Sequence, residues 1–213
     1  MFVKIKYPRT PHLPYSLGYT RDDWVWESDD NFLNKQVVVT TKMDGENTTI
    51  YSDGTCHARS LSSTHRSYHS WLLAYIPTIQ NCIPDRYRLC GEYLYAKHSI
   101  FYDNLESYFL AFCLWNRDNC AITWDEFMEF CNKNNIPHVP VLYEGVYDAK
   151  IIKQLAEDTV ANGQEGIVVR NRGSFHMSEF KENVAKYVRE NHVQTKEHWQ
   201  YSQITKNLLQ NKK

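Results

Sequence analysis

The sequence predicts an α+β fold in which largely antiparallel sheets are flanked by helices. Short β-branched or aromatic runs recur along the chain and are bounded by turn residues, which is typical of strands. Segments with apolar residues at helical spacing lie between some of these runs, but they do not alternate with the strands as in a regular βαβ fold. A length of 213 residues fits one large domain, or one domain with a small appendage.

In the first half of the chain we expect an irregular lead-in, two turns between strands, and one helix. Residues 1–35 are rich in proline and aromatic side chains. Strands are predicted on both sides of a turn at residues 44–45, and the chain then turns back through residues 57–59. Thr64 is expected to cap a helix, and Pro77 is expected to end it because proline disrupts a helix interior.

In the second half we expect three helices and four strands. The run Thr123-Trp124-Asp125-Glu126 is a capping box that opens the first of these helices. Asp148 is expected to open the next helix, which Asn162-Gly163 ends. A last helix is predicted from Thr195 through Leu209. The strands predicted here span residues 87–95, 108–115, 165–170 and 184–188.

The composition indicates a protein with a substantial core and a balanced charge. Hydrophobic residues make up 42% of the chain, and 24 Lys and Arg face 25 Asp and Glu, so charge alone does not indicate nucleic-acid binding. We find neither a signal peptide nor a segment that could span a membrane. The six cysteines form no Cys-x-x-Cys pair, and we therefore expect a reduced, cytoplasmic protein rather than a zinc or disulfide protein.

Lys42 is the strongest candidate for chemistry. It follows the β-branched run at residues 37–41, and Asp44 and Gly45 come directly after Met43. A strand would hold the lysine backbone in place, and the Asp-Gly turn would let a nucleotide approach the main chain. Since lysine attacks only as a free amine, we expect cationic or metal neighbours that lower its pKa. Taken alone, the same pattern also fits an exposed lysine beside a hairpin turn.

Four further motifs follow Lys42 in the chain. Arg59-Ser60 comes after the second turn, and Gly91-Glu92 opens an aromatic strand. Glu165-Gly166 opens an apolar strand, and Lys186 lies on the last predicted strand. Each motif is common by itself, but the ordered series is not.

Together these motifs resemble the covalent nucleotidyltransferase superfamily, which contains ATP-dependent DNA ligases, RNA ligases and mRNA capping guanylyltransferases. Those enzymes carry a Lys-x-Asp-Gly nucleophile followed by Arg-Ser, Gly-Glu, aromatic, Glu-Gly and basic elements in this order. The sequences of residues 12–16, 42–49 and 186–192 look most like the RNA ligase branch. This resemblance implies the ligase and capping-enzyme catalytic fold.

The resemblance also implies a domain organisation. Residues 1–190 would form the nucleotidyltransferase, or adenylation, domain. DNA ligases and capping enzymes continue into an OB-fold, whereas residues 191–213 are expected to form only a short helical tail. We therefore expect a minimal ligase, or one that depends on a separate partner protein or domain in place of the OB-fold.

The resemblance assigns roles to individual residues. Lys42 would attack the α-phosphorus of ATP, release pyrophosphate and retain AMP through a phosphoramide bond. Glu92 would accept a hydrogen bond from the ribose, and Glu165 would hold Mg²⁺ or Mn²⁺, a hard cation that suits carboxylate and phosphate oxygens. The remaining expected nucleotide-binding residues are Thr41, Asp44, Asn47, Arg59, Phe112 and Lys186.

Three positions leave questions of specificity and role open. Thr40-Thr41 replaces a glutamate that helps relatives to read adenine, and Val188 stands where relatives carry a second cation. Phe112 would stack on the purine, but a core phenylalanine on an alternating strand fits its pattern nearly as well. His12 and Ser16 are further candidates to approach the phosphates.

The resemblance implies an ATP-dependent RNA ligase that joins 5′-phosphate and 3′-hydroxyl RNA ends through enzyme-AMP and AMP-capped RNA. A DNA ligase is the nearest alternative, and a guanylyltransferase fits less well without the C-terminal domain. A subunit that only binds nucleotides or RNA ends is the non-enzymatic alternative. We would expect such a subunit to have lost Lys42, Glu92 or Glu165, all of which are present.

Overall fold

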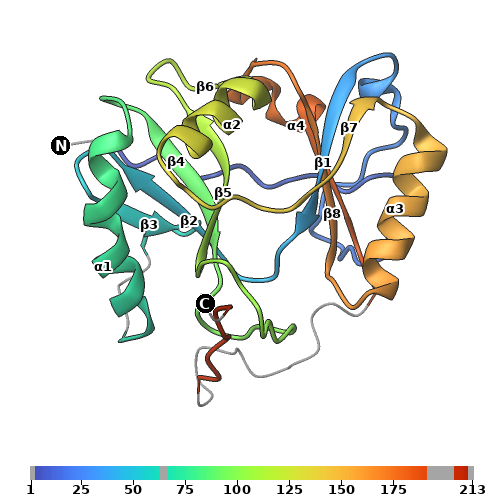
Figure 1. The fold of residues 1–213 in the computed structure, drawn as a ribbon. Coiled ribbons are helices and arrows are strands. Elements are labelled where there is room, and N and C mark those ends of the chain that lie inside the picture. Colours follow the sequence, from blue (N-terminus) through green and yellow to red (C-terminus); the bar gives the residue numbers. More distant parts are fainter. Residues whose placement is uncertain (1–2, 63–66, 191–203, 211–213) are drawn as a thin grey trace.

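Two antiparallel sheets face each other and carry helices on their outer sides (Figure 1). We describe residues 3–62, 67–190 and 204–210 of a computed structural model. The smaller sheet has the strand order β10-β8-β1-β7, and the larger has the order β3-β2-β4-β5-β6-β9. The α+β class and the antiparallel sheets are therefore confirmed.

The strands of the smaller sheet are β1 (Gln36–Lys42), β7 (Val141–Val146), β8 (Gly166–Asn171) and β10 (Val184–Val188). Those of the larger sheet are β2 (Glu46–Tyr51), β3 (Cys56–Ala58), β4 (Arg88–Tyr93), β5 (Phe109–Trp115), β6 (Cys120–Ala121) and β9 (Phe175–His176). The helices are α1 (Ser70–Ile79), α2 (Trp124–Lys133), α3 (Ala149–Ala161) and α4 (Phe180–Asn183). None of the helices among these residues is long and apolar enough to cross a membrane.

The two sheets are joined within a few residues of Lys42. Lys42 ends β1 in the smaller sheet, and Glu46 begins β2 in the larger sheet. The strands that flank the predicted turn at residues 44–45 therefore belong to different sheets and do not form a hairpin. This crossing places the end of β1 between the two layers.

Helix caps are formed as the sequence predicts. The Thr123 hydroxyl accepts a hydrogen bond from Glu126 N, and the Glu126 carboxylate accepts one from Thr123 N, which completes the capping box of α2. Asp148 accepts hydrogen bonds from Lys150 N and Ile151 N, two of the free N–H groups in the first turn of α3. These contacts satisfy donors that would otherwise lack partners at a helix start.

The prediction that Pro77 ends its helix is wrong. Pro77 lies inside α1, which continues to Ile79. Ile76 and Ile79 are buried on either side of it, and this burial offsets the single backbone hydrogen bond that proline removes. The expected cap at Thr64 lies outside the described residues.

The predicted C-terminal helix does not extend through Leu209. Residues 204–210 are extended, with isolated bridges from Lys206 to Ala96 and from Leu209 to Leu105. Backbone pairing to a neighbouring loop satisfies polar groups that a helix would have satisfied internally. Residues 191–203, where the helix would begin, lie outside the described residues.

Gly166 tests how tightly the smaller sheet is packed beside Lys42. It pairs with Lys42 on one side and with Val188 on the other, and a Cβ there would overlap the Tyr187 carbonyl. We expect Gly166→Ala to destabilise the protein by about 3 kcal/mol or more, because backbone atoms cannot move aside. Gly173→Ala, whose Cβ would meet nothing closer than 3.5 Å, is the control. Equal melting temperatures for the two variants would contradict this packing.

Candidate active site

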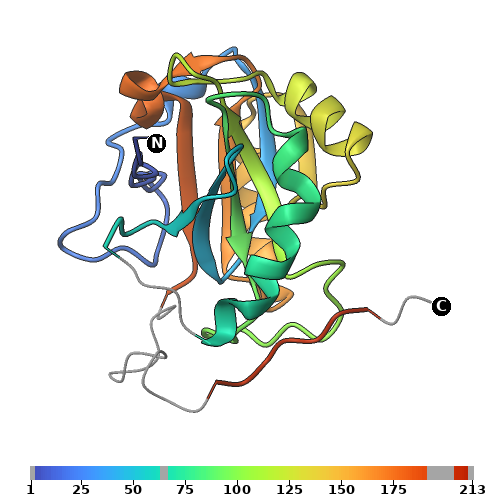
Figure 2. The same ribbon diagram turned by 90° about the vertical axis from the view of Figure 1, so that its left-hand side faces the viewer.

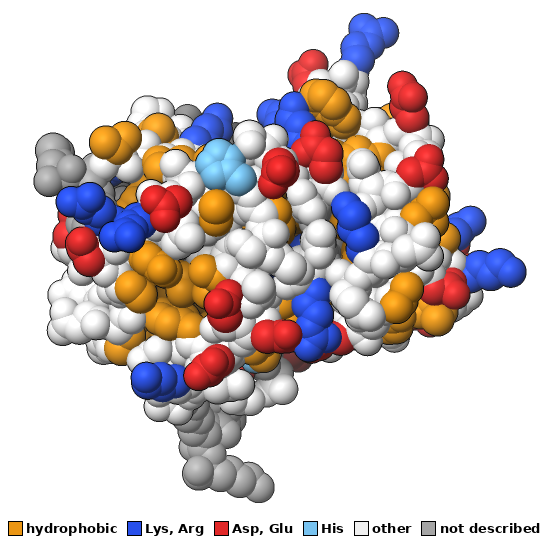
Figure 3. Space-filling model, turned by 90° about the horizontal axis from the view of Figure 1, so that it is seen from above, with side chains coloured by type: hydrophobic (Ala, Val, Ile, Leu, Met, Phe, Trp, Pro, Cys, Tyr) orange, Lys and Arg blue, Asp and Glu red, His pale blue; other side chains and the backbone are white. Residues whose placement is uncertain are grey.

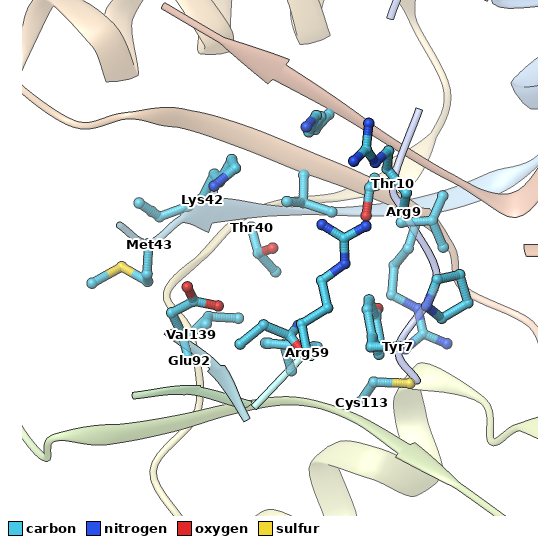
Figure 4. A pocket seen from close by; sticks show the side chains of 18 of the residues that line it. Tyr7, Arg9, Thr10, Thr40, Lys42, Met43, Arg59, Glu92, Cys113 and Val139 are labelled. Carbon is cyan, nitrogen blue, oxygen red and sulfur yellow. The ribbon is translucent and has the colours of Figure 1, made fainter. Parts of the chain in front are cut away.

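A pocket of about 440 Å³ opens between the two sheets. In Figure 4, Lys42 lies toward one end of the pocket, Tyr7 and Cys113 lie toward the other, and Arg59 projects between them. Seven of the predicted residues line it: Thr41, Lys42, Asn47, Arg59, Glu92, Phe112 and Lys186.

Lys42 and Glu165 form an ion pair at one end of this pocket. Lys42 Nζ donates a hydrogen bond of 2.6 Å to Glu165 Oε2. The contact follows from strand register, because Lys42 pairs with Gly166 and Glu165 directly precedes that glycine. Antiparallel pairing of β1 and β8 thus brings together two residues that are far apart in the sequence.

The carboxylates keep Lys42 protonated in the absence of ligand. Burial alone would lower the pKa of Lys42, but Glu165 and Glu92 outweigh it, so the pKa lies above its usual value. The expectation of neighbours that lower this pKa is therefore not met by the protein alone. To act as a nucleophile, Lys42 would have to lose a proton, and a bound ligand would have to supply the positive charge that lowers its pKa.

Glu92 approaches Lys42 from the opposite sheet. It lies on β4, and its Oε1 accepts a hydrogen bond of 3.1 Å from Gly45 N. Burial raises the pKa of Glu92 to about 8, with Glu165 and Asp44 acting in the same direction and Lys42 opposing them. Glu92 is thus a carboxyl group whose negative charge is poorly compensated.

Two half-buried cations, Arg59 and Lys186, line the pocket. Burial lowers the pKa of Lys186 to about 8, and Lys42 and Arg59 act in the same direction. Burial also lowers the pKa of Arg59, with Arg9 contributing, and the Arg59 Nε atom is buried without a hydrogen-bond partner. Cations gathered at this density favour a ligand that carries several negative charges.

These cations are a local feature of the pocket. The face of the molecule seen in Figure 3 carries acidic and basic side chains interspersed with apolar ones. Together with the balanced composition, this distribution places the concentration of positive charge inside the pocket.

The other end of the pocket is apolar and aromatic. Phe112 from β5 and Val168 from β8 both line it and pack on the same apolar cluster. Tyr7 meets Phe112 edge to face, with ring centroids 5.3 Å apart. Apolar side chains from two sheets form a slot that suits a planar ring such as a nucleotide base. Phe112 lines the pocket, as predicted, and is also partly buried against the core.

The lead-in forms one wall of the pocket, which the sequence did not reveal. Tyr7, Arg9 and Asp23 line the pocket. The segment is fixed to β10 because Leu13 N donates to Lys186 O at 2.8 Å and Lys186 N donates to Pro11 O at 2.9 Å. Figure 2 shows this blue segment beside the orange strand β10. The cluster Tyr7-Pro8-Arg9 was the one available signal for it.

His12 and Ser16 support this wall from behind. Neither residue lines the pocket, and both are buried. His12 Nδ1 and Ser16 Oγ are hydrogen bonded at 2.8 Å, and Val188 N donates to Ser16 Oγ at 3.0 Å. We predicted that His12 and Ser16 approach the phosphates, but in the structure they lie behind the pocket wall and hold β10 in place.

Asp44 also differs from its prediction as a nucleotide-binding residue. It does not line the pocket, and its Oδ2 atom accepts hydrogen bonds from Ser99 N, Ser99 Oγ and Ile100 N at 2.7–2.8 Å. With three donors already bound, the carboxylate is committed to the neighbouring loop. The geometry therefore assigns Asp44 to the structure of the turn.

The residues near Lys42 fit a divalent cation that is shared with a substrate. Within residues 3–62, 67–190 and 204–210, no group of three or more His, Cys, Asp or Glu side chains could hold a metal by itself. Glu165 nevertheless places a carboxylate 2.6 Å from Lys42, and Glu92 adds a second carboxyl group from the opposite sheet. Mg²⁺ commonly takes one or two carboxylates together with substrate phosphates, so this donor set suits it.

Comparison with known protein families shows to which family this chain belongs. The family model described as RNA ligase matches residues 35–188, which include Lys42, Glu92, Glu165 and Lys186. The chain belongs to the RNA ligase family. A comparison with curated proteins gave no match.

Solved structures support the same fold for this family member. An archaeal ATP-dependent RNA ligase is similar with a TM-score of 0.60 at 15% identity, over 86% of this chain and 48% of that one. A Naegleria gruberi RNA ligase mutant with ATP and Mn has a TM-score of 0.55 at 19% identity, over 75% and 51%. A structure assigned provisionally as an ATP-dependent DNA ligase of Aquifex aeolicus has a TM-score of 0.60 at 19% identity, over 88% and 50%. The chain spans about half the length of these proteins.

Glu92 should make stability depend on pH. Because its pKa is about 8 when folded and 4.5 in a model compound, the folded state holds a proton that the unfolded state loses between these values. Stability should therefore fall as pH rises from about 4.5 to 8, by on the order of a few kcal/mol. Glu92→Gln should flatten this fall in melting temperature, and Glu129→Gln on the exposed face of α2 should not. Parallel curves for wild type and Glu92→Gln would contradict the assignment.

The Lys42–Glu165 pair predicts a second titration. Glu165→Gln removes the nearest negative charge and should lower the pKa of Lys42 in the ligand-free protein. The pKa can be measured from the pH dependence of Lys42 acetylation, read by mass spectrometry of the modified peptide. Glu182→Gln, at an exposed position, is the control. An unchanged Lys42 titration in Glu165→Gln would show that the ion pair does not control the amine.

Proposed function

We propose that this chain is the adenylation domain of an ATP-dependent RNA ligase that joins 5′-phosphate and 3′-hydroxyl RNA ends. The observation that carries the proposal is the position of Lys42. Its amine lies 2.6 Å from Glu165, and Lys42 lines a pocket together with two half-buried cations, Arg59 and Lys186, and the aromatic ring of Phe112. Membership of the RNA ligase family supports the proposal.

In the first step, Lys42 Nζ attacks the α-phosphorus of ATP. The new N–P bond forms as the P–O bond to pyrophosphate breaks. The ammonium form of Lys42 loses two protons in all, so the nitrogen of the phosphoramide is uncharged while its phosphoryl group keeps one negative charge. Lys186 and Arg59 neutralise charge on the phosphates, while Phe112 and Val168 hold the base. Glu92 accepts a hydrogen bond from the ribose.

Glu165 links the charge state of Lys42 to the arrival of substrate. When bound, Mg²⁺ or Mn²⁺ would be held by Glu165 and phosphate oxygens and would supply positive charge to the leaving pyrophosphate. A Glu165 carboxylate shared with such a cation would pair less strongly with Lys42. The pKa of Lys42 would then be lower, which is the direction that attack requires.

Two further transfers complete the reaction. The RNA 5′-phosphate attacks the Lys42-bound AMP, which releases the amine and forms a pyrophosphate-linked AMP cap on the RNA. The RNA 3′-hydroxyl then attacks the capped phosphate, forms the phosphodiester and expels AMP. One ATP is thereby converted to AMP and pyrophosphate for each bond formed.

DNA ligation is the alternative activity, because the structure assigned provisionally as an Aquifex DNA ligase shares this fold with the same TM-score, 0.60, as the archaeal RNA ligase. Joining assays with matched RNA and DNA strands, each carrying a 5′-phosphate and a 3′-hydroxyl, separate the two. Sealing of RNA but not DNA supports the proposal, and the opposite result replaces RNA ligase by DNA ligase.

The nucleophile is tested by labelling with ATP that carries a radioactive α-phosphate. The wild type should retain the label in a bond that acid cleaves and pyrophosphate reverses. Lys42→Arg should bind ATP but take no label, because a guanidinium stays protonated at neutral pH. It should still seal RNA that already carries a 5′-adenylate. Lys150→Arg, at an exposed position on α3, is the matched control. Acid-labile label on Lys42→Arg would place the nucleophile elsewhere.

A further inference from the structure

A short C-terminal segment contacts the loop that holds the nucleophile turn. We call residues 204–210 the strap and residues 94–105 the clamp loop. Lys97 N donates to Thr205 O at 2.8 Å, and Leu105 N donates to Leu208 O at 3.0 Å. The strap is therefore hydrogen bonded to the clamp loop near both ends of the loop. In Figure 2 the strap is the dark red trace below the helices.

Asn207 is the central contact between the strap and the clamp loop. Its side chain is fully buried, with 0% exposure. Its Nδ2 donates to Leu94 O at 2.8 Å, and its Oδ1 accepts from Tyr102 N at 3.0 Å. Its carbonyl accepts from the Tyr108 hydroxyl at 2.8 Å. A buried amide with both functions satisfied fixes the backbone on each side of it.

The clamp loop in turn holds the turn that follows Lys42. Asp44 N donates to the Tyr102 hydroxyl at 2.9 Å. The Asp44 carboxylate accepts its three hydrogen bonds from Ser99 and Ile100 in the same loop. Arg189 adds a hydrogen bond of 3.2 Å to Ser99 Oγ. Tyr102 is thus bonded to Asn207 through its backbone and to Asp44 through its side chain.

We propose that Asn207 is a positioning residue for Lys42, acting through Tyr102 and the clamp loop on the turn at Asp44. The backbone of Asp44 lies two residues from the nucleophile, so a shift of the loop moves the base of the lysine side chain. Misplacement of a reacting group by about 1 Å can cost on the order of 100-fold in rate. The inference rests on the proposed function, since it concerns transfer of AMP to Lys42.

The test compares Asn207→Ala with Leu208→Ala in the full chain. Leu208 lies in the same strap, but its side chain is 49% exposed. We expect Asn207→Ala to slow adenylation roughly 10- to 100-fold at saturating ATP with little change in KM. Leu208→Ala should keep the wild-type rate. Melting curves establish that each variant is folded at the assay temperature.

Tyr102→Phe provides a second variant that keeps the ring and removes only the hydroxyl that Asp44 N contacts. If Asn207 acts through Tyr102, the double variant should be about as slow as the slower single variant. Hydrogen exchange of the Asp44 amide, followed by NMR, should be faster in both single variants. This exchange does not depend on activity.

Three results would overturn the inference. They are a wild-type adenylation rate in folded Asn207→Ala, a slowing that appears only as a raised KM, and rate losses that multiply in the double variant. An unchanged Asp44 exchange rate in Asn207→Ala would also overturn it. Absence of label on the wild type would instead overturn the proposed function, while Asp44 exchange would still report whether Asn207 controls the turn.

Discussion

The site depends on the way the chain passes from one sheet to the other between Lys42 and Glu46. This crossing leaves the lysine at the junction of two layers, where it meets Glu165 from its own sheet and Glu92 from the opposite one. The crossing is so close that a Cβ on Gly45 would overlap the backbone of β4. Close backbone packing therefore requires a residue without a side chain at position 45, near the lysine that is predicted to carry the chemistry.

The pocket keeps charges of both signs in unfavourable surroundings. The pKa of Lys186 is lowered and that of Glu92 is raised, so each group resists its charged form in the empty pocket. A triphosphate with a divalent cation brings both signs of charge and would relieve both effects. In the proposed reaction this arrangement would stabilise the bound state relative to the free one, as expected of a site preorganised for the charges of its substrate.

Most of the fold and much of the site could be predicted because the relevant signals are local. Caps such as Thr123 and the strand after Glu165 involve neighbouring residues, and their geometry follows from short-range sterics and hydrogen bonds. Pro77 was wrongly predicted because tertiary burial outweighs one lost hydrogen bond. The strand β7 was not predicted, since half-exposed residues give it no clear alternation.

What the sequence could not supply are contacts between distant segments. The role of Asp44 depends on a loop that lies more than 50 residues away in the chain, and the contribution of Tyr7 depends on pairing of the lead-in with β10. The order of the motifs predicts which residues carry the chemistry. It held no information about which of them face the pocket and which support it.

The wall formed by the lead-in has a consequence for biosynthesis. Tyr7 and Arg9 find their places against β10, whose strand Val184–Val188 follows them by more than 170 residues in the sequence. A nascent chain therefore cannot complete this pocket until β10 has left the ribosome and paired with the lead-in. Until then the pocket lacks Lys186, and Lys42 has only part of the charged surroundings that it has in the folded chain.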